Sequence, residues 1–223
     1  MGLAHSPGRR TGLLGAAGHS FYMASLYELK PRFQTLLRPL AQRLLAAGIT
    51  PNAVTLAALV LSLAMGAALA LWSASVWPLA AVPFALLLRM ALNALDGMMA
   101  REGGLASKFG LVLNETGDIL ADGALYLPFA LALGAHPLLA GGFVLLAAAS
   151  EAAGLAGVAT GAGRRYDGPF GKSDRAAAIG ALAIAAALGV PLAAWIDWLF
   201  AIFAALTAAT IVNRALKAAR GTR

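Results

Sequence analysis

Six long apolar segments constrain what this chain can fold into more than any other feature of its sequence. A helix needs about 20 mainly apolar residues to cross the hydrocarbon core of a bilayer. The segments lie at approximately residues 53–73, 77–100, 110–133, 138–160, 176–190 and 195–212. The fifth is the weakest of them, because Pro191 interrupts it. The pattern predicts an all-α, polytopic membrane bundle of six transmembrane helices.

The composition supports lipid as the solvent of this chain. Hydrophobic residues make up 60% of the 223 residues and charged residues only 12%, which leaves too few polar side chains to cover a soluble globule of this size. The absence of cysteine excludes disulfides, thiolate metal sites and cysteine nucleophiles. A formal net charge of +7 would suit a nucleic acid, but the basic residues lie at the ends of apolar segments. We therefore expect the lipid bilayer as a partner and no nucleic acid.

The distribution of lysine and arginine predicts the orientation. All but Arg89 lie before the first segment, in the second and fourth connections or after the last segment: Arg9, Arg10, Lys30, Arg32, Arg38 and Arg43, then Arg101, Lys108, Arg164, Arg165, Lys172 and Arg175, then Arg214, Lys217, Arg220 and Arg223. The first, third and fifth connections carry none. Because cytoplasmic loops are enriched in these residues, we predict a multi-pass protein of the bacterial inner (plasma) membrane with both termini and the polar site on the cytoplasmic side.

The chain divides into an extension, one membrane domain and a tail. Residues 1–22 are rich in Gly, Ser and His and lack the apolar core of a signal peptide, so we expect a disordered extension. We expect a single membrane domain over residues 23–218, with transmembrane helices between residues 53 and 212, and a basic tail at 219–223. In residues 26–46 leucines alternate with basic residues at helical spacing, which predicts an N-terminal interfacial amphipathic helix. A helix packed on the bundle would carry the same pattern.

Ionisable residues are costly inside membrane helices, and here they cluster on two neighbouring segments. At helical spacing, one face of the second segment carries Arg89, Asn93, Asp96, Gly97 and Ala100. One face of the third segment carries Gly110, Asn114, Asp118 and Asp122, with Glu115 beside them. Because a short loop joins the two segments, we expect the helices to be neighbours and the two faces to meet near the cytoplasmic membrane surface.

Several carboxylates that converge in a low dielectric repel one another strongly, and a hard cation is the usual solution. Mg²⁺ and Mn²⁺ both take oxygen ligands of this kind. The sequence therefore predicts a site for a divalent metal. A structural interpretation of the single residues is the alternative: Asp96 would pair with Arg101 or Arg89, and Asp122 would accept a hydrogen bond in helix packing.

The spacing of these residues resembles the signature of the class-I CDP-alcohol phosphotransferases, which are integral membrane enzymes. Their pattern is D-x2-D-G-x2-A-R-x8-G-x3-D-x3-D, and this chain matches it with asparagine at the first and third aspartate positions, Asn93 and Asn114. The resemblance extends through Thr-Pro-Asn at 50–52 and Gly-Lys-Ser at 171–173, and covers roughly residues 25–215. Within the family, the chain looks closest to YnbA-type bacterial inner-membrane proteins.

The resemblance implies a metal-dependent transferase of phospholipid biosynthesis. In the family, aspartates hold two ions that bind the diphosphate of a CDP-linked donor, and the last aspartate takes the proton of the acceptor hydroxyl. Carried over, Asp118 would be the catalytic base and Asp96 the principal metal ligand. Two fewer negative charges weaken metal binding, so we expect one or two ions of Mg²⁺ or Mn²⁺. The metal ligands would be Asp96, Asp118, Asn93 and Asn114, with Glu115 or Asp122 as compensating acids.

The resemblance also assigns residues to the donor and the acceptor. The CDP-binding residues would be Asn52, Thr55, Gly97, Ala100, Arg101 and Gly110, and the acceptor-binding residues Lys172, Ser173 and Arg175. Lys172 and Arg175 would suit an acceptor that carries a phosphate. Basic residues that merely follow the positive-inside rule and face lipid headgroups would produce the same pattern.

The leading prediction is a phosphatidyltransferase that moves a phosphatidyl group from CDP-diacylglycerol to a small alcohol, phosphorylated or not, and releases CMP. One alternative reverses the role of the lipid, with a CDP-amino alcohol donating to diacylglycerol. Another is a degenerate, non-catalytic protein that binds or transports a CDP-lipid, which the two asparagines favour. Family members often form homodimers, and the resemblance implies that assembly here as well.

Overall fold

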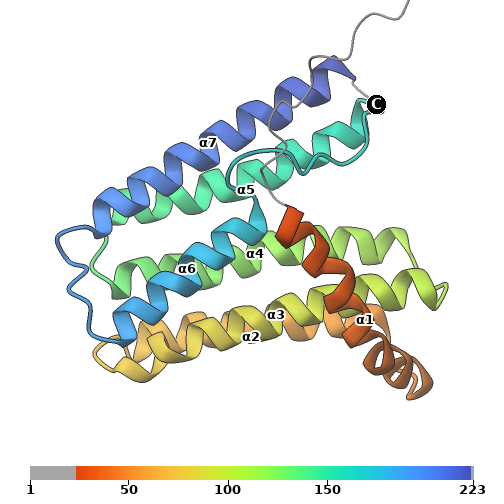
Figure 1. Cartoon of the computed structure of the whole chain (residues 1–223), viewed down its shortest axis with the longest axis horizontal. Helices are drawn as coiled ribbons and strands as arrows, with labels where there is room; N and C mark the ends of the chain where they lie inside the picture. Colours follow the sequence, from red (N-terminus) through yellow and green to blue (C-terminus); the bar gives the residue numbers. More distant parts are fainter. Residues whose placement is uncertain (1–23, 222–223) are drawn as a thin grey trace, which may run out of the picture.

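The computed structural model describes residues 24–221, which form seven helices and the connections between them (Figure 1). They are α1 (Ala24–Ala46), α2 (Pro51–Leu71), α3 (Val76–Glu102), α4 (Lys108–Ala132), α5 (Pro137–Ala159), α6 (Lys172–Ala187) and α7 (Ile196–Arg220). No strand occurs within the described residues. The predicted all-α fold is therefore confirmed. The extension predicted at 1–22 and the last two residues of the predicted tail lie outside the described range.

Four of these helices, α2, α3, α5 and α7, are long and apolar enough to cross a membrane, by length and composition. Helix α4 has the length but carries several charged residues, and α6 has only 16 residues. Large apolar side chains such as Phe84, Leu145 and Trp198 are exposed on the outside of the bundle, as expected where lipid covers the surface. The structure thus agrees with a membrane helical bundle, and the number of six crossings stays a prediction.

Short side chains at the helix starts place predicted site residues in the first turns. At α2, Thr50 accepts a hydrogen bond at Oγ1 from the Ala53 amide (3.2 Å). At α6, Asp174 accepts a hydrogen bond from the Gly171 amide (2.9 Å). This cap lets α6 begin at Lys172, ahead of the apolar segment. Helix α7, in turn, continues past its apolar segment through a basic last turn.

Helix α2 is the element against which both polar helices pack. The main helix pairs are α5 with α7, α2 with α4, α2 with α3, α3 with α6, α4 with α5, and α1 with α3. We expected α3 and α4 to be neighbours whose polar faces meet. Both helices pack against α2, and their polar faces do meet, through side-chain hydrogen bonds. Gly66 permits this arrangement, because a methyl group there would lie 1.9 Å from the Ala124 carbonyl oxygen of α4.

The connections between the helices alternate between the two ends of the bundle. Figure 1 shows the α3–α4 and α5–α6 connections and the end of α7 toward one end, and the α2–α3, α4–α5 and α6–α7 connections at the other. The connections that carry lysine and arginine thus share one end. This distribution agrees with the charge pattern of the sequence, while the membrane side that each end faces stays a prediction.

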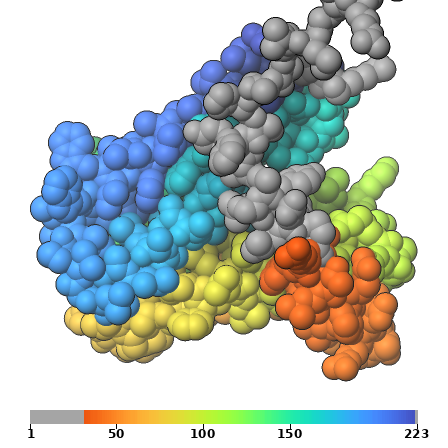
Figure 2. All heavy atoms as spheres, in the orientation of Figure 1, coloured from red at the N-terminus to blue at the C-terminus, as the bar shows by residue number. Residues whose placement is uncertain are grey.

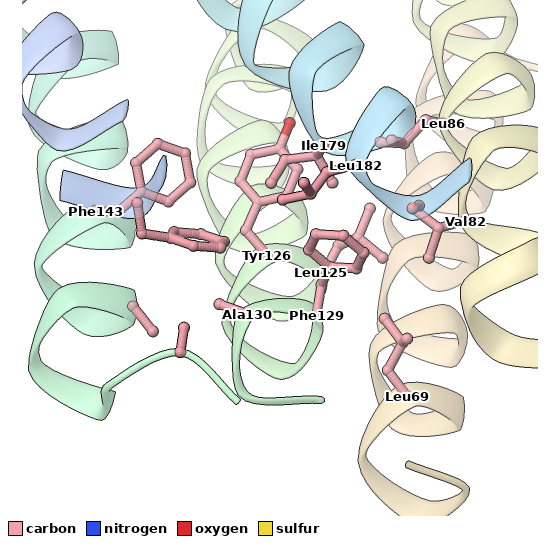
Figure 3. Close-up of a cluster of buried hydrophobic side chains, with 14 of the residues drawn as sticks. Leu69, Val82, Leu86, Leu125, Tyr126, Phe129, Ala130, Phe143, Ile179 and Leu182 are labelled. Carbon is pink, nitrogen blue, oxygen red and sulfur yellow. The ribbon is translucent and has the colours of Figure 1, made fainter. Parts of the chain in front are cut away.

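An aromatic core joins the helices next to the polar residues (Figure 3). Tyr126 and Phe129 of α4 pack with Phe143 of α5, Ile179 of α6 and Phe200 of α7, and all five are fully buried. The rings of Phe143 and Phe200 meet edge to face, with centroids 5.5 Å apart. Tyr126 lies one helical turn beyond the last acidic residue of α4, so the polar cluster adjoins this core.

Helix α1 packs across the end of α3, at the edge of the bundle (Figure 2). Ala41 is buried in an apolar cluster with Met99 of α3, and Arg38 forms a 3.1 Å ion pair with Glu102. Leu36 is 75% exposed, so part of the apolar stripe has no cover within the described residues. The predicted helix is present and packed on the bundle. Its position in a membrane interface stays a prediction.

Candidate active site between α3, α4 and α6

Asp96 of α3 is the centre of one half of the polar cluster. The residue is buried, with 4% of its surface exposed. Its Oδ2 atom accepts a hydrogen bond from the Thr55 hydroxyl of α2 (2.7 Å) and another from the Asn114 amide of α4 (3.2 Å). Three helices therefore meet at one carboxylate oxygen, and both donors are neutral.

Asp118 of α4 is the centre of the other half, and cations surround it. Its Oδ1 atom accepts a hydrogen bond from the Asn93 amide of α3 (3.0 Å) and lies 3.6 Å from Arg89 Nη2. Its Oδ2 atom forms an ion pair with Lys172, the first residue of α6. Arg89 also donates to the Asp118 carbonyl oxygen (3.2 Å). The side chains of α3, α4 and α6 therefore converge on this aspartate.

Two glycines of the motif leave room for polar side chains. A methyl group on Gly110 would lie 2.8 Å from Asn52 Oδ1, so the Asn52 carboxamide rests against the start of α4. A methyl group on Gly97 would lie 3.2 Å from Arg101 Nη1, so the Arg101 guanidinium lies back along its own helix. Ala100, in the same helical turn, is partly exposed. The residues predicted to bind CDP are thus located around the ends of α2, α3 and α4 near Asp96.

A cavity of about 140 Å³ opens between α3 and α6, next to the partners of Asp118. Its lining consists of Leu86, Arg89, Met90, Asn93, Tyr126, Lys172, Ser173 and Ala176. The Tyr126 hydroxyl is buried and has no hydrogen-bond partner among the described residues, so it offers a donor and an acceptor to a bound molecule. Lys172 and Ser173, predicted to bind the acceptor, therefore share one cavity with Asn93, predicted to bind metal.

A buried ion network lies behind this cavity. Asp122 Oδ1 lies 2.6 Å from Arg89 Nη2, and its Oδ2 lies 3.4 Å from Arg175 Nη2. Glu151 Oε1 of α5 lies 2.8 Å from Arg175 Nη2 and 3.4 Å from Arg214 Nη1 of α7. Buried charges are tolerated only when they are paired, and each of these two carboxylates contacts at least two guanidinium groups.

Three residues assigned to binding by the sequence belong to this network rather than to the cavity. Arg175 is fully buried and holds Asp122 and Glu151 together. Glu115 forms an ion pair with Arg164, which also lies 3.2 Å from Glu151. Asp122 and Glu115 are thus already compensated by arginine, and Arg175 supports the site from behind.

The α5–α6 connection is tied to α7 through Asp167. The Asp167 carboxylate lies 2.6 Å from Lys217 Nζ and 3.0 Å from Arg165 Nε. The hydrogen bond from Lys217 is the main reason that the pKa of Asp167 lies below its ordinary value. In the same connection, burial lowers the pKa of Arg164. These contacts hold the connection, and with it Arg164, against the ion network.

Arg214 and Ser150 are network residues that the sequence did not single out. Arg214 Nη1 donates to the Ser150 carbonyl oxygen (2.6 Å), and Arg175 Nη1 donates to the Ser150 hydroxyl (3.0 Å). In the sequence, Arg214 counts only as one of several basic residues near the C-terminus. Its one distinguishing signal is that helical periodicity continues past the apolar segment and places it on the buried face of α7.

The oxygen-bearing side chains around Asp96 and Asp118 are of a kind that binds hard divalent cations. Carboxylate and carboxamide oxygens are ligands that Mg²⁺ and Mn²⁺ accept. Among the described residues, no group of three or more His, Cys, Asp or Glu is arranged to hold a metal, because Asn93 and Asn114 occupy two of the four motif positions. Asp122 and Glu115 do not enlarge the set, since arginine already compensates both.

The fold and the site together describe an α-helical bundle rich in apolar helices, with a cluster of oxygen-bearing side chains beside a small polar cavity. The sequence profile of the CDP-alcohol phosphatidyltransferase family matches residues 48–212. This chain therefore belongs to the CDP-alcohol phosphatidyltransferase family, and the predicted family resemblance is confirmed.

Two relatives illustrate the range of similarity. Inner membrane protein YnbA of Escherichia coli K12 is 42% identical over 190 residues, which cover 85% of this chain and 94% of that protein. A phosphatidylinositol phosphate synthase of Mycolicibacterium smegmatis is 38% identical over 109 residues, which cover 47% of this chain and 46% of that enzyme. The similarity to YnbA thus extends over nearly the whole length, and the similarity to the synthase over about half.

Solved structures of a Mycobacterium tuberculosis phosphatidylinositol phosphate synthase share the fold. The form with CDP-DAG bound superposes with a TM-score of 0.62 at 22% identity, over 81% of this chain and 92% of that chain. The form in complex with manganese and citrate superposes with a TM-score of 0.63 at 24% identity, over 81% and 87%. At this identity, the likeness shows a common helical architecture.

Proposed function

We propose that this protein transfers a phosphatidyl group from CDP-diacylglycerol to a small alcohol and releases CMP, with the help of Mg²⁺ or Mn²⁺. The observation that carries the proposal is the convergence of Asp96 and Asp118 from two helices, beside a cavity lined by Lys172 and Ser173. Family membership supports the class of reaction. A relative named phosphatidylinositol phosphate synthase, and structures of such an enzyme with CDP-DAG and with manganese, support the donor and the metal.

In the proposed reaction, the acceptor hydroxyl approaches the phosphorus that carries diacylglycerol. Asp118 takes the hydroxyl proton while the new P–O bond forms, and the bond from this phosphorus to the CMP oxygen breaks, so that CMP leaves with the electron pair. A bound divalent ion supplies positive charge that neutralises and orients the diphosphate. Asp96 is the proposed principal ligand, and Asn93, Asn114 and Asp118 complete the set.

The donor nucleotide would lie across the ends of α2, α3 and α4. The residues proposed to contact it are Asn52, Thr55, Gly97, Ala100, Arg101 and Gly110. The glycines and the alanine leave space, and the exposed Arg101 brings a positive charge that suits a diphosphate. Thr55 would have a second role, because its hydroxyl already holds Asp96 in place.

The acceptor would occupy the cavity between α3 and α6. Lys172 and Ser173 are proposed to bind it, and the ammonium of Lys172 suits a phosphorylated alcohol. The cavity is small, with a volume of about 140 Å³, which favours a compact acceptor. Arg175 is proposed to position the cavity wall, since it is fully buried and held by Asp122 and Glu151.

We further propose a single membrane domain over residues 23–218 that crosses the bacterial inner membrane six times and assembles as a homodimer. The site and both termini would face the cytoplasm, with α1 lying in the interface. The charge distribution in the loops and the name of the E. coli relative, an inner membrane protein, support this location.

The test is an assay of CMP release by the purified full-length protein in detergent. The protein is given labelled CDP-diacylglycerol, Mg²⁺ or Mn²⁺, and a panel of phosphorylated and free alcohols. Asp118→Asn is expected to lower turnover by about 10²–10⁴-fold while thermal unfolding is unchanged. Asp197→Asn is the matched control, because Asp197 accepts a hydrogen bond from the His136 amide at the opposite end of the bundle. Full activity of Asp118→Asn would remove Asp118 as the base.

Two other functions give different results in the same assay. CMP release from a CDP-amino alcohol with diacylglycerol as acceptor would indicate transfer in the reverse sense. A non-catalytic CDP-lipid-binding or transport protein is favoured by one observation, the pairing of Asp118 with both Lys172 and Arg89. Measurable CDP binding without CMP release from any donor and acceptor pair would establish that role.

A further inference from the structure

The two motif aspartates differ in how their charges are compensated. Asp96 is buried and receives hydrogen bonds from neutral groups, the side chains of Thr55 and Asn114 and the backbone of Gly97. Among residues 32–221, whose side chains the structure describes, it forms no ion pair. Asp118, in contrast, contacts two cationic side chains, Lys172 and Arg89. A buried carboxylate without a positive partner is costly. The charge of Asp96 therefore favours the binding of a cation, whereas the charge of Asp118 is already compensated.

Lys172 is the dedicated cation of Asp118. Arg89 lies closer to Asp122 (2.6 Å) than to Asp118 (3.6 Å), so most of its charge serves the ion network. The only ion pair that Lys172 forms within the described residues is the one with Asp118. Its backbone is held in the first turn of α6 by the Asp174 cap, and its side chain also lines the acceptor cavity.

Asn93 completes this arrangement. Its amide donates to Asp118 Oδ1 (3.0 Å) while Lys172 occupies Oδ2. A carboxylate at position 93 would lie against Asp118 and add a negative charge, which is the condition that draws in a divalent ion. The neutral Asn93 removes this charge, and one ammonium group is then sufficient to compensate Asp118.

We infer that this site holds a single divalent ion, centred on Asp96 and Asn114, and that the ammonium of Lys172 takes the place of a second ion at Asp118. The inference rests on the proposed function, because it states how that site compensates the negative charges of the donor diphosphate and of a phosphorylated acceptor. Lys172 would carry its positive charge to the boundary between the donor diphosphate and the acceptor cavity. Asn93 and Lys172 form a matched pair, so changing both should create the second ion site.

The experiment is a Mn²⁺ titration of the purified full-length protein in detergent with CDP, with free Mn²⁺ measured by electron paramagnetic resonance. The wild type should bind one Mn²⁺ per chain. Asp96→Asn should weaken that site at least about tenfold. The double variant Asn93→Asp/Lys172→Met should bind two Mn²⁺ per chain. Lys108→Met is the matched control, since Lys108 is exposed at the start of α4 and should leave one ion bound.

Lys172→Arg is a second control in case the methionine variant misfolds. It keeps the positive charge at position 172 and should therefore bind one Mn²⁺ per chain. Two Mn²⁺ per chain in the wild type would overturn the inference, and so would one ion in a folded Asn93→Asp/Lys172→Met variant. CMP release is measured on the same samples. Two ions with CMP release would leave the proposed function standing and remove only the single-ion inference. One ion without CMP release from any substrate pair would uphold the single-ion site and remove the proposed function.

Discussion

Arg175→Met is the substitution expected to damage the bundle most. The Arg175 side chain is fully buried and contacts Asp122 (3.4 Å), Glu151 (2.8 Å), the Ser150 hydroxyl (3.0 Å) and the Phe170 carbonyl oxygen (3.4 Å). Methionine keeps an extended apolar side chain but offers no donor to these groups. Removing one partner of a buried ion pair typically costs about 3–5 kcal/mol, because the remaining charge stays buried.

The surrounding contacts place the cost near the lower end of that range. Asp122 keeps Arg89 at 2.6 Å, and Glu151 keeps Arg164 at 3.2 Å and Arg214 at 3.4 Å. Neither acid is therefore left without a partner. We expect a loss of about 3 kcal/mol in the free energy of unfolding, which corresponds to a fall in Tm of about 6–12 °C for a chain of this size.

Thermal unfolding in detergent, followed by the fluorescence of the four tryptophans, measures this loss. Arg220→Met is the matched control, because Arg220 is exposed in the last turn of α7, and it should change stability by less than about 0.5 kcal/mol. The double variant Arg175→Met/Glu151→Gln should recover part of the loss, since it also removes a buried negative charge. An unchanged Tm for Arg175→Met would refute the reasoning.

The same variant separates two roles of Arg175. A residue that binds the acceptor, as the sequence indicated, would raise the KM for the acceptor when replaced and leave the Tm unchanged. A residue that supports the cavity wall should lower the Tm and leave the KM of the folded fraction near that of the wild type. A raised KM at constant Tm would restore the original assignment.

The remaining predictions concern helix packing, pH and topology. Gly66→Ala should cost about 1–3 kcal/mol, because its methyl group would lie 1.9 Å from the Ala124 carbonyl oxygen, whereas Gly142→Ala, with nothing within 4 Å, should be neutral; equal Tm values for the two would contradict the close α2–α4 approach. The lowered pKa of Asp167 means that its pair with Lys217 stabilises the fold above the ordinary aspartate pKa of 3.8 and that this contribution is lost as the pH falls through the lowered value. Lys217→Met should therefore lower the free energy of unfolding at neutral pH by less than about 1 kcal/mol for this half-exposed pair, seen as a slightly lower Tm. The difference from the wild type should vanish well below pH 3.8; a difference independent of pH would exclude this pair as its source. Because the chain has no cysteine, Ala74→Cys and Ala106→Cys can each be labelled with an impermeant maleimide in membrane vesicles, and we expect the two to react from opposite sides; labelling from the same side would contradict the proposed topology.

Local patterns were sufficient to predict the helices and the polar stripe. Apolar periodicity and capping groups such as Thr50 act over a few residues, so most helices lie close to the apolar segments of the sequence. Asp96 and Asp118 were identified because acids inside apolar segments are rare and their spacing matches a family signature. The same reasoning left two interpretations of Lys172, which would either contact lipid headgroups or bind the acceptor. Only the fold places it on Asp118.

The sequence by itself determined the class of protein, the helix order and the inventory of oxygen-bearing side chains, because these follow from composition, periodicity and spacing along the chain. The tertiary structure decided which acids are compensated by arginine, as Asp122 and Glu151 are, and which one is left with neutral partners, as Asp96 is. It also decided that α3 and α4 both pack on α2 and meet each other mainly through polar side chains. Charge compensation in a low dielectric depends on separations of a few ångströms between helices far apart in the chain, and the order of residues does not specify those separations.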